Sequence, residues 1–187
     1  MARQRPDEIE KKEFSETVIS IDRVARVVKG GRRFRFRATV VVGDTKTRVG
    51  VGVAKGADVQ TAVTKAVDTA KKNMITIVID NETIPHEIAG RVGGARVMLK
   101  PAPAGTGLNA GGTMRNVLDV TGLKNIICKS LGSSNKINVA YATVQALGSS
   151  VAKENWVTAE LHEGVRKSRA SARKQTAKKT DKVKAEA

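Results

Sequence analysis

The chain has 187 residues and a formal net charge of +16, with 34 Lys and Arg residues against 18 Asp and Glu residues. Its length allows one or two small domains, and its basic character favours a polyanionic partner. No apolar run approaches the ~18 residues that a membrane-spanning helix requires, so no such helix is expected.

The positive charge is not confined to the end of the chain. Residues 165–187 hold nine basic and two acidic side chains, which leaves 25 basic and 16 acidic ones before them, a net charge of +9. The folded part is therefore expected to be basic itself. Residues 1–13 are polar and charged, and we predict a disordered arm there.

Residues 23–37 form the most informative segment, with seven positive charges, no negative charge and a Lys-Gly-Gly turn in the middle. A strand is predicted from Ser15 to this turn, and a second from about 33 to 42, because apolar and polar residues alternate. Six of the seven cations are arginines, whose guanidinium groups match phosphate oxygens in pairs. We expect the hairpin's apolar side chains to anchor it to a core: Val24, Val27, Val28, Phe34 and Phe36. The alternative is a merely solvated charged face.

A third strand is predicted at 48–54, followed by the clearest helix of the chain, with Asp58 as its N-cap. The helix has one apolar stripe of small side chains, which indicates close packing on a sheet. Its members are Val59, Ala62, Val63, Ala66, Val67 and Ala70. Three antiparallel strands and one helix are expected in this first unit.

The second half alternates strands and helices. Strands are predicted at 75–79, 87–91, 96–100 and 123–130, and helices at 114–121 and 136–147, with Gly122 ending the first helix. A short helix anchored by Trp156 and Leu161 is expected at 154–164. The fold class is therefore α+β, with an RNA-binding β-β-β-α domain at 14–79, a βαβ domain at 80–152, and a short helix with a basic tail at 153–187.

The glycine-rich loop at 101–112 is a candidate phosphate site, because loops of this kind expose backbone N–H groups to anions. Thr113 stands where a P-loop needs lysine. The loop also resembles the Pro-x-x-x-Gly-Leu-x-Ser-Ser motif of galactokinase-type and homoserine-kinase-type enzymes, but Asn109 and Ala110 occupy the hydroxyl positions and the chain is too short. A phosphotransferase is therefore the weaker alternative to a structural or interface loop.

No other pattern indicates catalysis or a cofactor. His86 and His162 are far apart and have no cysteine pair beside them, so zinc spacing does not arise. The lone Cys128 lies in an apolar run and is expected to be a buried hydrophobic side chain in a reducing compartment. With no secretory signal in view, we expect an intracellular protein without enzymatic activity, metal, cofactor or small-molecule substrate.

Six blocks, in order and with matching spacing over about 14–147, resemble the family of the fifth protein of the bacterial small ribosomal subunit. They are VARVVKGGRRFRFRA at 24–38, VGD at 42–44, RVGVG at 48–52, KKNMI at 71–75, PAPAGTGLNAGGTMR at 101–115 and LGSSN at 131–135. The resemblance implies a domain related to double-stranded-RNA-binding domains, followed by a left-handed βαβ domain whose fold the kinases share. The two ends of the chain fall outside the matching blocks, so the resemblance implies no structure or function for them.

The resemblance also implies a function. Members of the family are structural proteins of the cytoplasmic ribosome that bind 16S ribosomal RNA near the link between the head and body of the small subunit. They contact the fourth and eighth small-subunit proteins and support decoding accuracy. The charged hairpin corresponds to the family's loop near the spectinomycin site, and residues 105–115 correspond to its interface with the fourth protein. A free RNA-binding regulator or chaperone with the same domains is the alternative.

Two sets of site residues follow from the charge pattern and the resemblance together. The predicted RNA-binding residues are Arg23, Arg26, Lys29, Gly30, Gly31, Arg32, Arg33, Arg35, Arg37, Lys55, Lys71 and Lys72. The predicted protein interface consists of Gly105, Thr106, Gly107, Asn109, Gly111, Gly112 and Arg115. We expect Gly111 and Gly112 to be glycine because a side chain would clash there or strain the turn.

Overall fold

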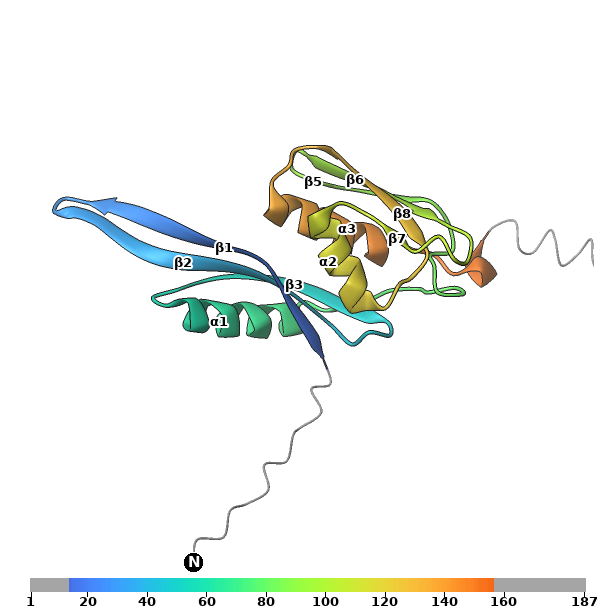
Figure 1. Cartoon of the computed structure of the whole chain (residues 1–187), viewed down its shortest axis with the longest axis horizontal. Coiled ribbons are helices and arrows are strands. Elements are labelled where there is room, and N and C mark those ends of the chain that lie inside the picture. Colours follow the sequence, from blue (N-terminus) through green and yellow to red (C-terminus); the bar gives the residue numbers. More distant parts are fainter. Residues whose placement is uncertain (1–13, 157–187) are drawn as a thin grey trace, which may run out of the picture. The chain divides into compact units, whose positions relative to one another are not determined.

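The computed structural model describes residues 14–156, of which residues 14–150 belong to one compact unit. Its first half is an antiparallel sheet in the order β1-β2-β3-β4, with a single helix (Figure 1). The elements are β1 (Ser15–Val28), β2 (Gly31–Gly43), β3 (Arg48–Gly56), α1 (Val59–Lys72) and β4 (Ile75–Thr76). The predicted three strands and helix are confirmed. The strand predicted at 75–79 is only two residues long and pairs with β3 at the edge of this first sheet, so its predicted length and its place in the second half are wrong.

Helix α1 packs closely on one face of this sheet because both surfaces are made of small residues. A Cβ atom on Gly50 would lie 2.3 Å from the Ala70 carbonyl oxygen, and one on Gly52 would lie 2.0 Å from that of Ala66. Ala62, Ala66 and Ala70 are themselves fully buried. The glycines of β3 thus let two backbones approach to a distance that side chains would prevent.

The second half contains a sheet in the order β5-β6-β8-β7 and two helices. Its elements are β5 (Ile88–Val92), β6 (Ala95–Pro101), β7 (Leu108–Asn109), α2 (Gly112–Thr121), β8 (Ile126–Gly132) and α3 (Lys136–Gly148). Strands β7 and β8 are parallel and joined through α2, so they form a βαβ unit, and the other pairs are antiparallel. The first strand of this unit, β7, lies in the segment predicted as a loop. Gly122 ends α2 in the left-handed conformation, with φ of 77°. The α+β class is confirmed.

Helices α2 and α3 pack against both sheets. Val41 and Val51 of the first sheet belong to the same buried core as Val117 and Leu118 of α2 and Leu147 of α3. The first sheet is therefore covered on both faces, by α1 on one and by α2 and α3 on the other (Figure 1). A division at residues 79 and 152 stays a prediction, because within residues 14–150 the two halves share this core.

The turn between β2 and β3 fastens the two halves together. The Thr45 backbone N–H donates to the Val120 carbonyl at 3.2 Å, and a Cβ atom on Gly122 would lie 2.3 Å from the Thr45 carbonyl oxygen. Asp44 holds this turn, since its Oδ1 accepts the backbone N–H groups of three following residues at 2.8–3.0 Å. Burial alone would raise the pKa of Asp44, but these hydrogen bonds and the Arg48 side chain hold it well below its ordinary value.

Residues 151–156 contain a 3₁₀ turn, Lys153–Asn155, and the Trp156 indole N–H donates to the Val151 carbonyl at 3.2 Å. The rest of the helix predicted at 154–164, with Leu161, lies outside the described residues, as do the predicted N-terminal arm and basic tail. Within residues 14–156 no helix is both long and apolar enough to cross a membrane.

Candidate nucleic-acid interface

The β1–β2 hairpin continues beyond the elements that cover the rest of the sheet. Pairing between β2 and β3 ends at Phe36 and Gly56, whereas β1 and β2 remain paired out to Val28 and Gly31. The residues from Arg23 to Arg35 therefore form a two-stranded ribbon that extends from the sheet (Figure 1). We call residues 23–35 the ribbon.

The expectation that apolar side chains anchor the whole ribbon to a core is wrong. Val27 is 76% exposed and Phe34 is 48% exposed, while Val24 and Val28 are only partly buried. Phe36 alone among the predicted anchors packs on the core beneath α1. The physical reason is length: β3 ends and α1 begins near the base of the hairpin, so nothing in residues 14–150 covers its outer part.

One face of the ribbon gathers cations around a hollow. Arg26 is paired with Arg33, Val24 with Arg35, and Arg37 with Lys55 of β3. Paired residues lie on the same face of a sheet, as do residues two apart along a strand, so all these cations point to one side. The hollow has a volume of about 260 Å³. Its lining comprises Val24, Ala25, Arg26, Arg33, Arg35 and Lys55. Four positive side chains thus line one open hollow whose remaining lining is Val24 and Ala25, an arrangement suited to phosphate groups.

At the base of the ribbon the charge is balanced. Asp22 accepts a hydrogen bond from an Arg37 guanidinium N–H at 2.9 Å, and both side chains are partly exposed. Arg37, a predicted RNA-binding residue, is therefore already paired in this structure. From Arg23 outwards to Arg35 the ribbon holds no acidic residue, so its outer part keeps its full positive charge.

The opposite face of the ribbon has a different character. The Arg23 guanidinium carbon lies 3.8 Å from the centroid of the Phe34 ring, which is a close cation–π stack. Arg23 and Phe34 lie on the same face because Arg23 pairs with Phe36, two residues along the strand. Phe34 is thus held by an arginine rather than by a core.

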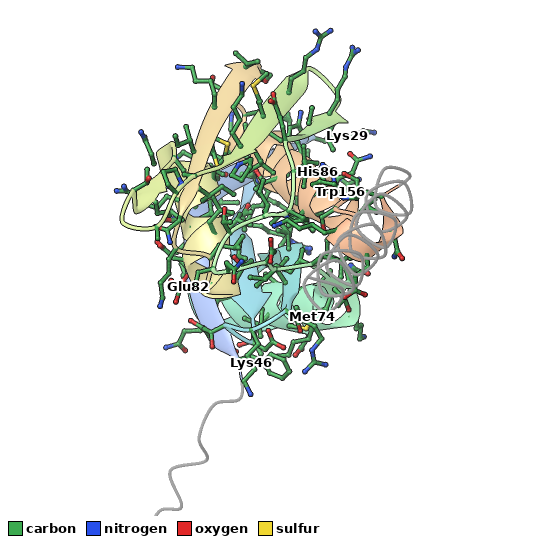
Figure 2. The ribbon with its side chains drawn as sticks, turned by 90° about the vertical axis from the view of Figure 1, so that its right-hand side faces the viewer. Lys29, Lys46, Met74, Glu82, His86 and Trp156 are labelled. Atoms are coloured by element: carbon green, nitrogen blue, oxygen red, sulfur yellow. The ribbon has the colours of Figure 1, made fainter. Side chains whose placement is uncertain are left out.

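The tip of the ribbon holds the remaining predicted hairpin residues: Lys29, Gly30, Gly31 and Arg32, all exposed. Gly31 has a φ of 139°, a conformation that side chains rarely adopt, and this explains the glycine in the turn. Lys29 and Lys46, both labelled in Figure 2, stand beyond the two ends of β2, so they mark the tip of the ribbon and the turn at the far end of the sheet.

The structure does not bring Lys71 and Lys72 to the ribbon. Both lysines lie in the last turn of α1, whereas the base of the ribbon lies beside the first turn of α1. The two turns are about 20 Å apart along the helix axis. Lys71 also forms an ion pair with Glu16 at 3.3 Å. The predicted RNA-binding residues therefore divide into a ribbon group that includes Lys55 and a distant helix pair.

The glycine-rich loop is shaped by a buried asparagine. The Oδ1 atom of Asn125, a residue 6% exposed, accepts the backbone N–H groups of Gly105 at 3.1 Å and Gly107 at 3.2 Å. These two glycines have φ of 90° and 73°, which makes them the positions that need glycine. The expected strain or clash at Gly111 and Gly112 is wrong, because neither residue has a positive φ. A Cβ atom on Gly111 would make an ordinary van der Waals contact, 3.6 Å from the Met114 Cε atom, and one on Gly112 would have no neighbour within 4 Å.

Other predicted interface residues lie on the same exposed loop or just after it. Thr106 donates its hydroxyl to the Pro103 carbonyl at 2.8 Å, and Arg115 of α2 donates to the Leu108 carbonyl at 2.8 Å. Asn109 is exposed on β7. The segment is therefore a defined and accessible surface, while its use as a protein interface stays a prediction.

Two features escaped the sequence reasoning. The role of Asn125 has no local signal, because its partners are 18 and 20 residues away. The second is the face of the second sheet that points away from α2 and α3, which carries four cations among exposed apolar side chains. Its members are Arg91, Arg96, Met98, Lys100, Ile127, Lys129 and Leu131, and the alternation of their strands could have revealed it.

The described residues hold no group of His, Cys, Asp or Glu side chains arranged as a metal site. Cys128 is 8% exposed, and its burial raises the pKa of the thiol to about 12. Its predicted role as a buried hydrophobic residue is confirmed.

Comparison with known proteins gives matches over both halves of the chain. A family model described as the N-terminal domain of ribosomal protein S5 matches residues 14–78, and one described as its C-terminal domain matches residues 90–158. The chain is 44% identical over 166 residues to the small ribosomal subunit protein uS5 of Thermotoga neapolitana. That alignment covers 86% of this chain and 93% of the relative.

Proposed function

This chain belongs to the ribosomal protein S5 family, and on that basis we propose that the ribbon binds 16S ribosomal RNA within the small ribosomal subunit. Membership makes the protein a structural, non-enzymatic component of the small subunit, cytoplasmic and ribosome-bound. The family expectation from the sequence is thereby confirmed. The RNA site, the protein partners and the role in accuracy are the proposed part.

The observation that carries the RNA site is the convergence of Arg26, Arg33, Arg35 and Lys55 on one hollow. Two paired strands hold the arginines, so ordering them on a ligand loses less entropy than ordering a tail would. Phosphate groups of an RNA backbone offer the charge and the bidentate geometry that arginine favours. The helix pair Lys71 and Lys72, by contrast, would meet a separate part of the RNA.

The glycine-rich loop is our proposed protein contact. Gly105 and Gly107 are exposed or partly exposed, and Asn125 fixes their backbone, so the loop presents a defined surface without large side chains. We assign this surface to the fourth small-subunit protein. Through this contact the chain would influence decoding accuracy near the junction of head and body, and the eighth protein would bind elsewhere.

Reconstitution of small subunits tests the RNA assignment. Particles assembled from 16S ribosomal RNA and the other small-subunit proteins are offered the wild-type chain, the triple variant R26A/R33A/R35A or the loop variant T106A/R115A. Retention after a high-salt wash and sedimentation is then measured. We expect the triple variant to be lost and the loop variant to be retained, with misreading changed in the latter.

A matched control removes equal charge elsewhere, in the variant K46A/K65A/K136A, whose three lysines are exposed and are not among the residues that line the hollow. Loss of this control to the same extent would mean that total charge, not the ribbon, drives binding. Equal retention of wild type and triple variant would overturn the RNA assignment. Wild-type chain that never co-sediments with subunits would favour the free regulator or chaperone.

A further inference from the structure

The two faces of the ribbon are chemically different, which a purely electrostatic role does not explain. The hollow face holds Arg26, Arg33 and Arg35 with no aromatic residue, whereas the other face holds the stacked pair of Arg23 and Phe34. Neutralising phosphates requires only cations. A half-exposed phenylalanine on the outer ribbon therefore calls for a second kind of contact.

Phe34 contributes little to the fold where it stands. It is 48% exposed and belongs to neither buried core cluster of the described residues. Arg23 stacks over one face of the ring with its guanidinium 3.8 Å from the centroid, which holds the ring and adds a second flat group on top of it. The result is a pre-ordered platform of one aromatic and one guanidinium plane.

We propose that this Arg23–Phe34 platform stacks an unpaired nucleobase of RNA while backbone phosphates occupy the hollow on the opposite face. This inference rests on the proposed RNA-binding function and specifies the ligand of the same ribbon. Aromatic rings and arginine planes are the surfaces on which proteins stack single-stranded bases. An acidic residue on the ribbon would oppose RNA, and residues 23–35 contain none.

The back-to-back arrangement also restricts the RNA. A base inside a regular helix keeps its flat surfaces covered by its neighbours, so only a base that has left the helix can reach the platform. Phosphates on one face and a free base on the other require a site where the strand departs from its duplex. The matching ligand class is therefore a helix with a bulged or flipped-out base.

Fluorescence with a defined RNA tests this assignment on the full chain. The probe is an RNA duplex of roughly 16 base pairs, enough for a small RNA-binding domain, with one bulged 2-aminopurine. Its fully paired counterpart lacks the bulge. Wild type is expected to prefer the bulged duplex by roughly 5-fold to 100-fold, the range of base–aromatic stacking, and to quench the 2-aminopurine on binding.

Three variants separate stacking from charge and from folding. F34A is expected to lose the preference and the quenching while keeping its affinity for the paired duplex, and F34Y is expected to retain both properties. V27A removes exposed apolar surface from the same face, 76% exposed in the wild type, without touching the platform, and is expected to behave like wild type. Circular dichroism and thermal unfolding check that each variant is folded.

Each other result overturns the inference in a distinguishable way. Equal binding of both duplexes by wild type removes the stacking site but leaves RNA binding by the ribbon intact. Binding of neither duplex contradicts the proposed RNA-binding function as well. A folded F34A variant that weakens both duplexes equally, or a V27A variant with the same defect, would make Phe34 a general surface contact and not a base platform.

Discussion

Removing the cations of the hollow should change the salt dependence of binding by a calculable amount. The triple variant R26A/R33A/R35A deletes three of the four cations that line the hollow and leaves Lys55 in place. Each phosphate contact contributes about 0.7–0.9 to the slope of log K against log salt concentration, so three contacts contribute about 2–3. Between 50 and 200 mM salt, these three contacts account for roughly a 20-fold to 40-fold loss of affinity.

The assay is filter binding or fluorescence anisotropy with reconstituted small-subunit particles that lack this chain, at several salt concentrations. The triple variant should bind more weakly at low salt and show a slope smaller by about 2–3 than the wild type. The variant K46A/K65A/K136A removes the same charge from positions outside the lining of the hollow and should keep most of the wild-type slope. Equal slopes for wild type and triple variant would refute the idea that the hollow meets phosphates.

Further predictions concern packing, pH, reactivity and the tail. G52A should lower the free energy of unfolding by about 1–3 kcal/mol, because its Cβ atom would lie 2.0 Å from the Ala66 carbonyl oxygen. G112A, whose Cβ atom would have no neighbour within 4 Å, should leave the free energy of unfolding unchanged, and urea unfolding measures both variants. D44A should cost about 1–2 kcal/mol at pH 7. Because folding lowers the pKa of Asp44, the extra stability of the wild type over D44A is fully present above the unfolded pKa and should shrink as the pH falls below about 4. A difference in unfolding free energy that grew on acidification would contradict this prediction. Cys128 should resist a thiol reagent at pH 8 until the chain is denatured, since burial raises its pKa to about 12; rapid native labelling would show an exposed thiol. Deletion of residues 165–187 should weaken cognate and random RNA by similar factors, whereas a selective loss of cognate binding would place specificity in the tail.

Local patterns predicted much of the fold because they report local physics. The small-residue stripe of α1 and the glycines of β3 fit each other, so the packing of helix on sheet follows from the sequence alone. The helix end at Gly122 could be predicted because a left-handed cap is a local feature, whereas the close approach of the Thr45 carbonyl to the same glycine could not. Short-range periodicity and caps are sufficient for features of this kind.

Features that depend on element length or distant partners could not be predicted. Alternation placed Phe34 and Phe36 on one face, but nothing in the sequence says that α1 reaches Phe36 and not Phe34. The sequence predicts constrained glycines at 111 and 112, whereas the loop positions with positive φ are 105 and 107, which are held by Asn125, far along the chain. The burial of the second face of the first sheet against α2 and α3 is likewise a tertiary effect.

Site-specific crosslinking in the assembled small subunit tests the central claim most directly. A photoreactive residue is placed at Arg33 on the hollow face or at Thr106 in the glycine-rich loop, and crosslinks are read at nucleotide and peptide resolution. The ribbon position should crosslink to a single region of 16S ribosomal RNA, and the loop position should crosslink to a neighbouring protein. Protein crosslinks from Arg33 together with RNA crosslinks from Thr106 would contradict the assignment of the ribbon as the RNA-binding surface.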